Sequence, residues 1–147
     1  MEAEWDCDLD QNLMGRMKII EIESVLESWE DYFYAEGADP KLKNFRPLDN
    51  FTEDVYCGIV LDGTGDQCMY YYDFGGDKLL PLDIDFKSYF ELAIDAKVMI
   101  YWQRYLVNLV TPQNYDISFP KKMKELFPDF DLDAFTAKFE SLRLSKR

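Results

Sequence analysis

The residues best suited to chemistry in this 147-residue chain are its carboxylates, because it contains no histidine. Asp62 and Asp66 flank a DGTGD turn and offer the hard oxygen ligands that a divalent cation prefers. They lack EF-hand spacing, and tight turns themselves select Asp and Gly, so we favour a structural turn. Asp83 and Asp85 resemble the carboxylate pair of a glycosidase, but among 29 acids such pairs arise by chance. We therefore expect no metal and no cofactor.

The three cysteines indicate neither a nucleophile nor a disulfide framework. Cys7, Cys57 and Cys68 are an odd number without CxxC spacing. A nucleophilic thiol needs a base or a cation beside it, and no imidazole exists to serve. Cys57 and Cys68 could face each other across a hairpin, although such cysteines are more often small buried hydrophobes. We expect a protein that is not an enzyme, in a reducing cytoplasm.

Aromatic residues make up 16% of the chain, and Tyr70, Tyr71 and Tyr72 stand in a row. Because side chains alternate along a strand, this run must place rings on both faces of a sheet. Core packing accounts for one face. The other face is either covered as well or a binding surface, since tyrosine offers a large contact area at low entropic cost. With the acidic turns, this predicts a partner-binding patch of Asp62, Asp66, Tyr70, Tyr72 and Asp77.

The chain carries 16 Lys and Arg against 29 Asp and Glu, a net charge of −13. This balance argues against nucleic-acid binding, which depends on basic residues neutralising phosphates, and against docking on an anionic membrane. The acidic first residues do not resemble a signal peptide, and no apolar run is long enough to span a membrane. The charge either serves solubility alone or complements a basic partner.

The sequence pattern in the first third of the chain predicts one long helix. Residues 1–12 are an acidic, partly ordered arm, from which Trp5 can reach the body of the protein. A helix is predicted over 17–36, followed by a loop over 38–54 that contains Pro40 and Pro47. The apolar stripe of that helix is Ile22, Val25, Leu26, Trp29, Tyr32 and Phe33.

The remainder predicts an antiparallel meander followed by helices. Strands over 55–61, 68–74 and 78–84 are joined by glycine turns at 62–66 and 74–77. Both alternating sets of side chains are apolar in the first two strands, which predicts cover on both faces, and Pro81 indicates an edge or a bulge. Helices are expected over 86–109, 120–127 and 131–143. Asp85 and Asp131 are the expected N-caps, and Arg104 is expected to pair with an acid.

We therefore expect a single α+β domain over 1–147, with a central antiparallel sheet flanked by helices. Several motifs follow one another along the chain: D-G-x-G-D (Asp62 to Asp66), the aromatic strand Tyr70 to Phe74, D-F-x-S-Y-F-E-L (Asp85 to Leu92), D-A-K…Y-W-Q (Asp95 to Gln103) and, more loosely, M-x-x-x-F-P (Met123 to Pro128). Through these motifs, residues 55–109 resemble the SUKH superfamily, the group related to fungal regulators of cell-wall assembly and killer-toxin resistance. Residues 1–50 depart from that pattern.

This resemblance implies a SUKH-like fold and a role in binding. Bacterial members are largely immunity proteins that neutralise toxins delivered between neighbouring cells, many of them nucleases. Applied to this chain, it implies a protein partner, a cognate bacterial toxin. Together with the net charge of −13 and the aromatic content, it predicts that this toxin has a basic surface and that the chain covers its active site. The alternative, suggested by the fungal relatives, is a regulatory or scaffold protein that binds an endogenous partner in cell-wall synthesis. A carboxylate-based metal enzyme is the class we favour least.

Overall fold

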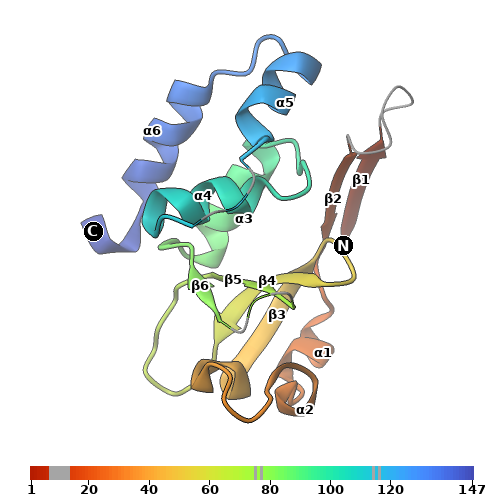
Figure 1. Ribbon diagram of the computed structural model, residues 1–147, viewed down its shortest axis with the longest axis vertical. Helices are drawn as coiled ribbons and strands as arrows, with labels where there is room; N and C mark the ends of the chain where they lie inside the picture. Colours follow the sequence, from red (N-terminus) through yellow and green to blue (C-terminus); the bar gives the residue numbers. More distant parts are fainter. Residues whose placement is uncertain (7–13, 75, 77, 114, 116) are drawn as a thin grey trace.

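A computed structural model of the chain describes residues 1–6, 14–74, 76, 78–113, 115 and 117–147. Its centre is a four-stranded antiparallel sheet in the order β3-β4-β5-β6, and helices lie on either side of it (Figure 1). The α+β class with a central antiparallel sheet is therefore confirmed. The strands are β3 (Phe45–Asn50), β4 (Val55–Val60), β5 (Tyr70–Asp73) and β6 (Leu80–Pro81).

The sheet carries a hydrophobic core on each face, as the two apolar sets of its strands predicted. Cys57 and Tyr71 belong to one core, whereas Tyr56, Tyr70 and Tyr72 belong to the other. The longer helices cover the first face, and two short helices with a 3-10 turn cover the second (Figure 1). They are α3 (Phe86–Asp95), α4 (Trp102–Val110), α5 (Phe119–Leu126) and α6 (Leu132–Leu142) on the first face, and α1 (Ile22–Leu26), α2 (Glu30–Phe33) and η1 (Pro40–Asn44) on the second.

The beginning of the chain, where an acidic, partly ordered arm was expected, is a β-hairpin over its described residues. β1 (Glu2–Asp6) pairs antiparallel with β2 (Met14–Lys18), and the rest of the expected arm lies outside the described residues. Trp5 does reach the body. Its Nε1 donates to the Lys97 carbonyl oxygen at 2.5 Å. The ring lies over Gly15, where a Cβ atom would come within 2.0 Å of the indole nitrogen.

The helix predicted over 17–36 is not formed. Residues 14–18 belong to β2, and the helical residues of the remainder are those of α1 and α2, with non-helical backbone before, between and after them. Glu27, at the C-cap of α1, is extended and ends the first helix, and Trp29 Nε1 donates to the Ser24 carbonyl oxygen at 2.8 Å across the break. The predicted apolar stripe does not form one buried face. Val25 is buried, whereas Ile22 and Leu26 face outward.

The loop predicted over 38–54 is also wrong, because it contains η1 and β3. Pro47 and Asp49 look like breakers in the sequence, but the register shifts between them as β3 pairs with β4. A bulge of this kind accommodates a proline and redirects the side chain that follows. Asp49 is the residue redirected here, and it lies 1% exposed inside the protein.

The meander is confirmed, with longer connections than expected. The first connection runs from the end of β4 at Val60 to Tyr70, so DGTGD is part of a wide loop and not a tight hairpin. The third strand is reduced to Leu80–Pro81 at the edge of the sheet, where a proline without an N–H is tolerated.

The helix predicted over 86–109 is broken between α3 and α4, although no Gly or Pro occurs there. Lys97, Val98 and Tyr101 have positive φ angles of 54°, 47° and 65°. The break permits backbone pairing with β2, because Arg16 N donates to the Val98 carbonyl oxygen at 2.7 Å and Ile100 N to that of Met14 at 3.1 Å. Long-range pairing with the hairpin thus replaces nearly two turns of helix, between the end of α3 at Asp95 and the start of α4 at Trp102.

Both predicted N-caps are confirmed, and the last two helices match their expected positions. Asp85 accepts from Ser88 N at 2.8 Å, and Asp131 accepts from Ala134 N at 2.9 Å. No helix among the described residues is both long and apolar enough to cross a bilayer.

The basic C-terminal residues hold the end of α6 against the start of α3. Arg143 Nε lies 2.6 Å from Asp83 Oδ2, and Ser145 N donates to the same carboxylate at 3.0 Å. Arg147 lies 2.7 Å from Asp85. Burial tends to raise the pKa of Asp83, but the hydrogen bonds from Ser145 and Arg143 outweigh it and lower that pKa. Arg143 and Arg147 near the C-terminus are therefore engaged in ion pairs with aspartates of the same chain.

Replacing Arg143 with Gln should destabilise the fold by about 2 kcal/mol at neutral pH, the range for a hydrogen bond to a charged group. Because the pKa of Asp83 is lowered by folding, this stability is present above its unfolded value and is lost as the pH falls through the folded value. Urea unfolding at pH 7 and at pH 3 measures both effects, and the deficit should shrink at pH 3. Lys121→Gln is the control, since its pair with Glu125 is exposed and spans 3.8 Å.

Candidate interaction surfaces

The two turn aspartates of the predicted patch lie in the β4–β5 loop and are bonded within it. Asp62 Oδ1 accepts from Thr64 N at 3.0 Å and from Thr64 Oγ1 at 2.6 Å. These hydrogen bonds lower the pKa of Asp62. Asp66 Oδ1 accepts from Cys68 N at 2.9 Å. The described residues include no group of three or more acids, cysteines or histidines that could hold a metal ion.

The two tyrosines of the predicted patch are not exposed. Tyr70 and Tyr72 are each 5% accessible, because the α2 and η1 side of the sheet is covered. Tyr72 packs edge-on against Phe33 at 5.4 Å, and the Tyr70 hydroxyl donates to Asp66 Oδ2 at 2.7 Å. The expectation of exposed rings on this face is corrected, and Asp77 lies outside the described residues. The patch keeps its exposed carboxylates and loses its aromatic surface.

The described cysteines lie in different cores and do not face each other. Cys57 lies opposite Tyr71 in the helix-covered core, and Cys68 lies in the core on the other face. Burial raises the pKa of both thiols, that of Cys57 well above its ordinary value. Both thiols are thereby kept protonated and inert, and Cys7 lies outside the described residues.

A buried polar cluster joins β3, α3 and α4, and sequence reasoning missed it. Asp49 Oδ2 accepts from the Tyr89 hydroxyl at 2.6 Å, and Asp49 Oδ1 accepts from Lys18 N at 2.8 Å. Gln103 Nε2 donates to the Tyr89 hydroxyl at 2.9 Å. Burial raises the pKa of Asp49 to about 6, although both hydrogen bonds oppose the shift. With Asp49, Tyr89 and Gln103 each at most 1% exposed, the cluster ties elements together and offers no open site.

Arg104 was expected to pair with an acid, and it pairs with Asp73 at 2.9 Å. Its Nε donates to the Tyr71 hydroxyl at 2.8 Å, and its guanidinium lies 4.0 Å from the Tyr101 ring centroid and 5.2 Å from that of Tyr115. The guanidinium is held on several sides, so it connects α4 to β5 as a structural cation.

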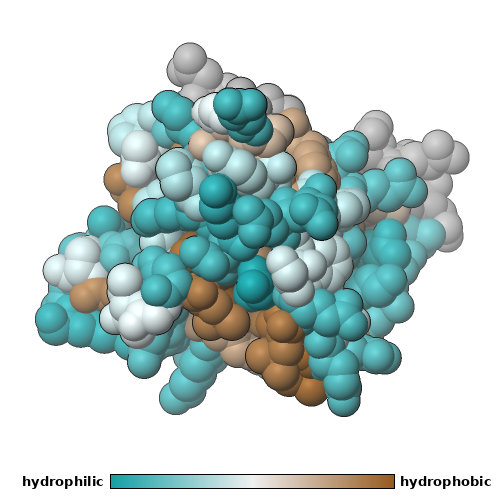
Figure 2. All heavy atoms as spheres, turned by 90° about the horizontal axis from the view of Figure 1, so that it is seen from below, coloured by the Kyte–Doolittle hydropathy of each residue, from teal (hydrophilic) through white to brown (hydrophobic). Residues whose placement is uncertain are grey.

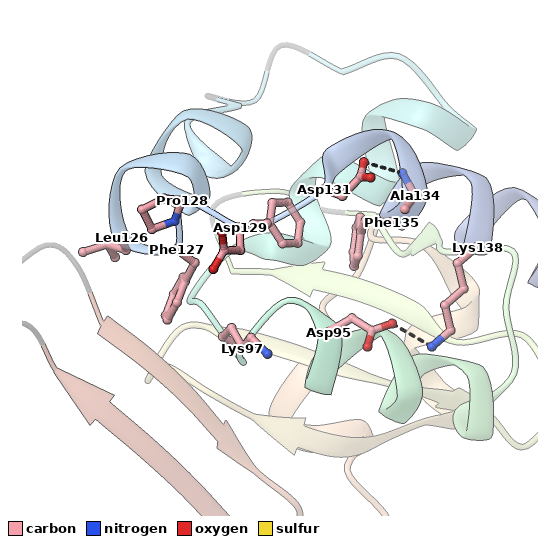
Figure 3. Close-up of a pocket in the computed structure, with 11 residues that line it drawn as sticks. Asp95, Lys97, Leu126, Phe127, Pro128, Asp129, Asp131, Ala134, Phe135 and Lys138 are labelled. Carbon is pink, nitrogen blue, oxygen red and sulfur yellow. Dashed lines mark hydrogen bonds and ion pairs between the residues drawn. The ribbon is translucent and has the colours of Figure 1, made fainter.

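Two adjoining hollows, together called the Phe127 groove, lie between the end of α3 and the α5–α6 connection. The larger has a volume of about 580 Å³ and is lined by Phe127, Phe135 and Lys97, among others (Figure 3). The smaller, of about 470 Å³, shares Phe127 and Lys97 and adds Trp5 and Ile94. The groove has an apolar floor of the size that small ligands or side chains occupy.

The acids around the Phe127 groove are largely engaged by neighbours. Asp95 Oδ2 lies 2.6 Å from Lys138 Nζ, and Asp131 caps α6 (Figure 3). The exposed Lys97 lines both hollows and adds a positive charge to the groove. The rim is thus of mixed sign, and it indicates no particular charge in a ligand.

A different surface, missed by the sequence because its side chains read as a core stripe, lies on α1 and α2. Leu26 and Ile22 are 67% and 62% exposed, and Tyr32 is 52% exposed. Figure 2 views the molecule from the end at which α1 and α2 lie in Figure 1, and apolar side chains gather there within largely hydrophilic surroundings. We define the α1–α2 surface by its exposed residues: Ile22, Glu23, Leu26, Glu27, Asp31 and Tyr32.

A base-free run of acidic residues forms and adjoins this surface. Residues 21–36 contain six acids and no Lys or Arg. One of them, Glu30, lies 4.0 Å from Lys43, and the three acids of the α1–α2 surface form no ion pair with the described residues. The α1–α2 surface therefore combines negative charge with exposed apolar side chains.

In comparisons with known proteins, the chain matches no family model, no curated protein and no solved structure.

Proposed function

We propose that the chain is a non-catalytic binding protein that neutralises a cognate bacterial toxin by covering a basic active site. The observation that carries the proposal is the acidic, base-free segment 21–36, which also exposes large apolar side chains. The resemblance of residues 55–109 to the SUKH superfamily, whose bacterial members are largely immunity proteins, supports the same function.

An acidic inhibitor and a basic active site have complementary electrostatic potentials. A nuclease needs a basic cleft to hold phosphates, and an acidic inhibitor approaching that cleft is steered by the opposite field. Such steering raises the association rate, whereas buried apolar anchors slow dissociation. A surface with both acids and exposed apolar side chains supplies both effects. The same charge arrangement opposes binding of the chain itself to nucleic acid.

The proposal is tested with the toxin-like protein encoded beside this chain in its native genome. Co-expression should rescue cells from that protein, and the purified pair should form a stable complex on gel filtration. A toxin inactivated at its catalytic residue keeps the binding measurement independent of toxicity. The absence of such a neighbour, or a neighbour that neither binds nor is neutralised, would overturn the proposal. A native complex with an endogenous cell-wall protein would instead favour the regulatory alternative.

A further inference from the structure

We infer that the α1–α2 surface is the contact face for the partner, and that the partner presents an apolar or aromatic side chain flanked by lysines or arginines. This inference rests on the proposed function and adds to it a location and a chemistry. It replaces the patch of turn aspartates and tyrosines that the sequence predicted.

The short helix α1 is well anchored to the body of the protein and exposes apolar side chains. Val25 is 3% exposed and holds α1 to the body, while Ile22 and Leu26, one turn apart, face solvent. Ile20 N donates to the Leu48 carbonyl oxygen at 2.9 Å, which fixes the start of α1 to β3. A partner would therefore meet Ile22 and Leu26 already positioned, and covering them would bring the usual gain from burying apolar area.

Aromatic side chains at the end of α2 add to this apolar area. The Tyr32 hydroxyl lies 2.9 Å from that of Tyr56, and its ring packs edge-on against Phe74 at 5.5 Å. Tyr32 is 52% and Phe74 39% exposed, so both rings are held in place and remain accessible. Rigid, half-exposed aromatic side chains are typical anchors at protein interfaces.

Negative charge surrounds these apolar side chains. Glu23, Glu27 and Asp31 are exposed and form no ion pair with any described residue. A covering partner must therefore offer basic groups at its rim, because an apolar or acidic rim would leave these carboxylates desolvated or opposed. The charge and the apolar area thus specify one kind of partner together.

The two competing surfaces fit a basic partner less well. In the Phe127 groove, Lys97 lines both hollows, and Asp95 is paired with Lys138. In the β4–β5 loop, Asp62 and Asp66 are bonded within the loop, and the adjacent Tyr70 and Tyr72 are buried. Among the described residues of the Phe127 groove, the exposed Ile94 is accompanied by one acid without an ion pair or a capping hydrogen bond, Asp129, whereas three acids without ion pairs accompany the exposed apolar side chains of the α1–α2 surface.

Site-specific photo-crosslinking in the native cell tests the location. Benzoylphenylalanine is placed at Leu26 in one strain and at Ile94, in the Phe127 groove, in another, since these side chains are 67% and 54% exposed. A third strain carries it at Leu61, beside the predicted turn patch, which is 46% exposed. We expect one major crosslinked protein at position 26, identified by mass spectrometry as basic. Stronger crosslinking at position 94 or 61, or an acidic product at 26, would overturn the inference.

Paired charge reversals then test the chemistry with that crosslinked protein as the purified probe. Glu23→Lys with Glu27→Lys should lower the association rate by roughly tenfold to a hundredfold at low salt, and by much less at high salt. Asp129→Lys with Asp133→Lys is the matched control, because each pair changes the net charge from −13 to −9. Equal effects of the two pairs would show that only the overall charge matters, and would overturn the inference.

The outcomes separate the surface from the function. Rescue of cells from the neighbouring toxin that survives the Glu23 and Glu27 reversals leaves the proposed function standing and removes the surface. If the basic protein crosslinked at Leu26 is not a toxin, the α1–α2 surface stands as the contact face and the proposed function is overturned. Circular dichroism and the urea midpoint should be nearly unchanged in both double variants, because all four side chains are exposed.

Discussion

Replacing Asp49 with Asn should flatten the pH dependence of stability. The pKa of Asp49 is raised by burial from 3.8 to about 6, which corresponds to about 3 kcal/mol of preference for the neutral form. Since folding raises this pKa, the native state binds the extra proton, and stability from this group falls as pH rises from about 4 to 6. The amide stays neutral, so the stability of Asp49→Asn relative to the parent should improve by about 3 kcal/mol between pH 4 and 7.5.

Urea unfolding of both proteins at several pH values measures this difference, and the other carboxylates cancel because both proteins share them. Parallel stability curves would contradict the assignment. Tyr89→Phe provides a second check, because the Tyr89 hydroxyl donates to the Asp49 carboxylate at 2.6 Å and lowers its pKa. Its loss should move the transition to higher pH. The fold thus keeps a titrating group where β3, α3 and α4 meet, and its stability should be greater in mildly acidic conditions than at neutral pH.

The cluster shows why part of this protein could not be predicted from its sequence. Asp49 reads as a loop residue between Pro47 and Asn50, and only the bulge between Pro47 and Asp49 turns it inward. Tyr89 and Gln103 follow helical spacing and read as ordinary helix positions. Their meeting depends on β3 pairing with β4 and on α3 packing over the sheet, and both are long-range events.

The elements that were predicted correctly depend on local rules. Asp85 and Asp131 were identified as caps because a carboxylate before a helix accepts from its free N–H groups. The meander followed from apolar strands separated by glycine turns, and Pro81 was placed at an edge because it lacks an N–H. Each of these signals lies within a few residues of the feature that it specifies.

The predictions that were wrong concern segments whose backbone pairs at long range. The helix expected over 86–109 breaks where Val98 and Ile100 bond to β2, and the first part of the helix expected over 17–36 is β2 itself. A helical period is only a weak preference, and tertiary pairing overrides it. The same error concealed the candidate surface, because Ile22 and Leu26 have the spacing of a buried stripe and are exposed.

At Gly58 a single added methyl group should have a large effect, because it would meet backbone atoms. It lies in the middle of β4, opposite Pro47 and next to the bulge. An added Cβ would lie 2.1 Å from the Arg46 carbonyl oxygen and 2.8 Å from the Pro47 Cα, and both atoms are backbone. No side chain can move aside to relieve this contact, so β3 would have to separate from β4.

Gly58→Ala should therefore destabilise the fold by about 3 kcal/mol or prevent folding, the upper range for overpacking a dense interior. Gly76→Ala is the matched control, because its Cβ would meet only the Asp73 carbonyl oxygen at an ordinary 3.6 Å. Urea unfolding of both variants gives the comparison, and equal midpoints would contradict the close approach at Gly58. If only Gly58→Ala loses stability, Asp49 should also leave its buried position in that variant, because the bulge that directs Asp49 inward is held by the same β3–β4 pairing. The pH dependence of stability and this glycine are thus linked through a single irregularity in β3.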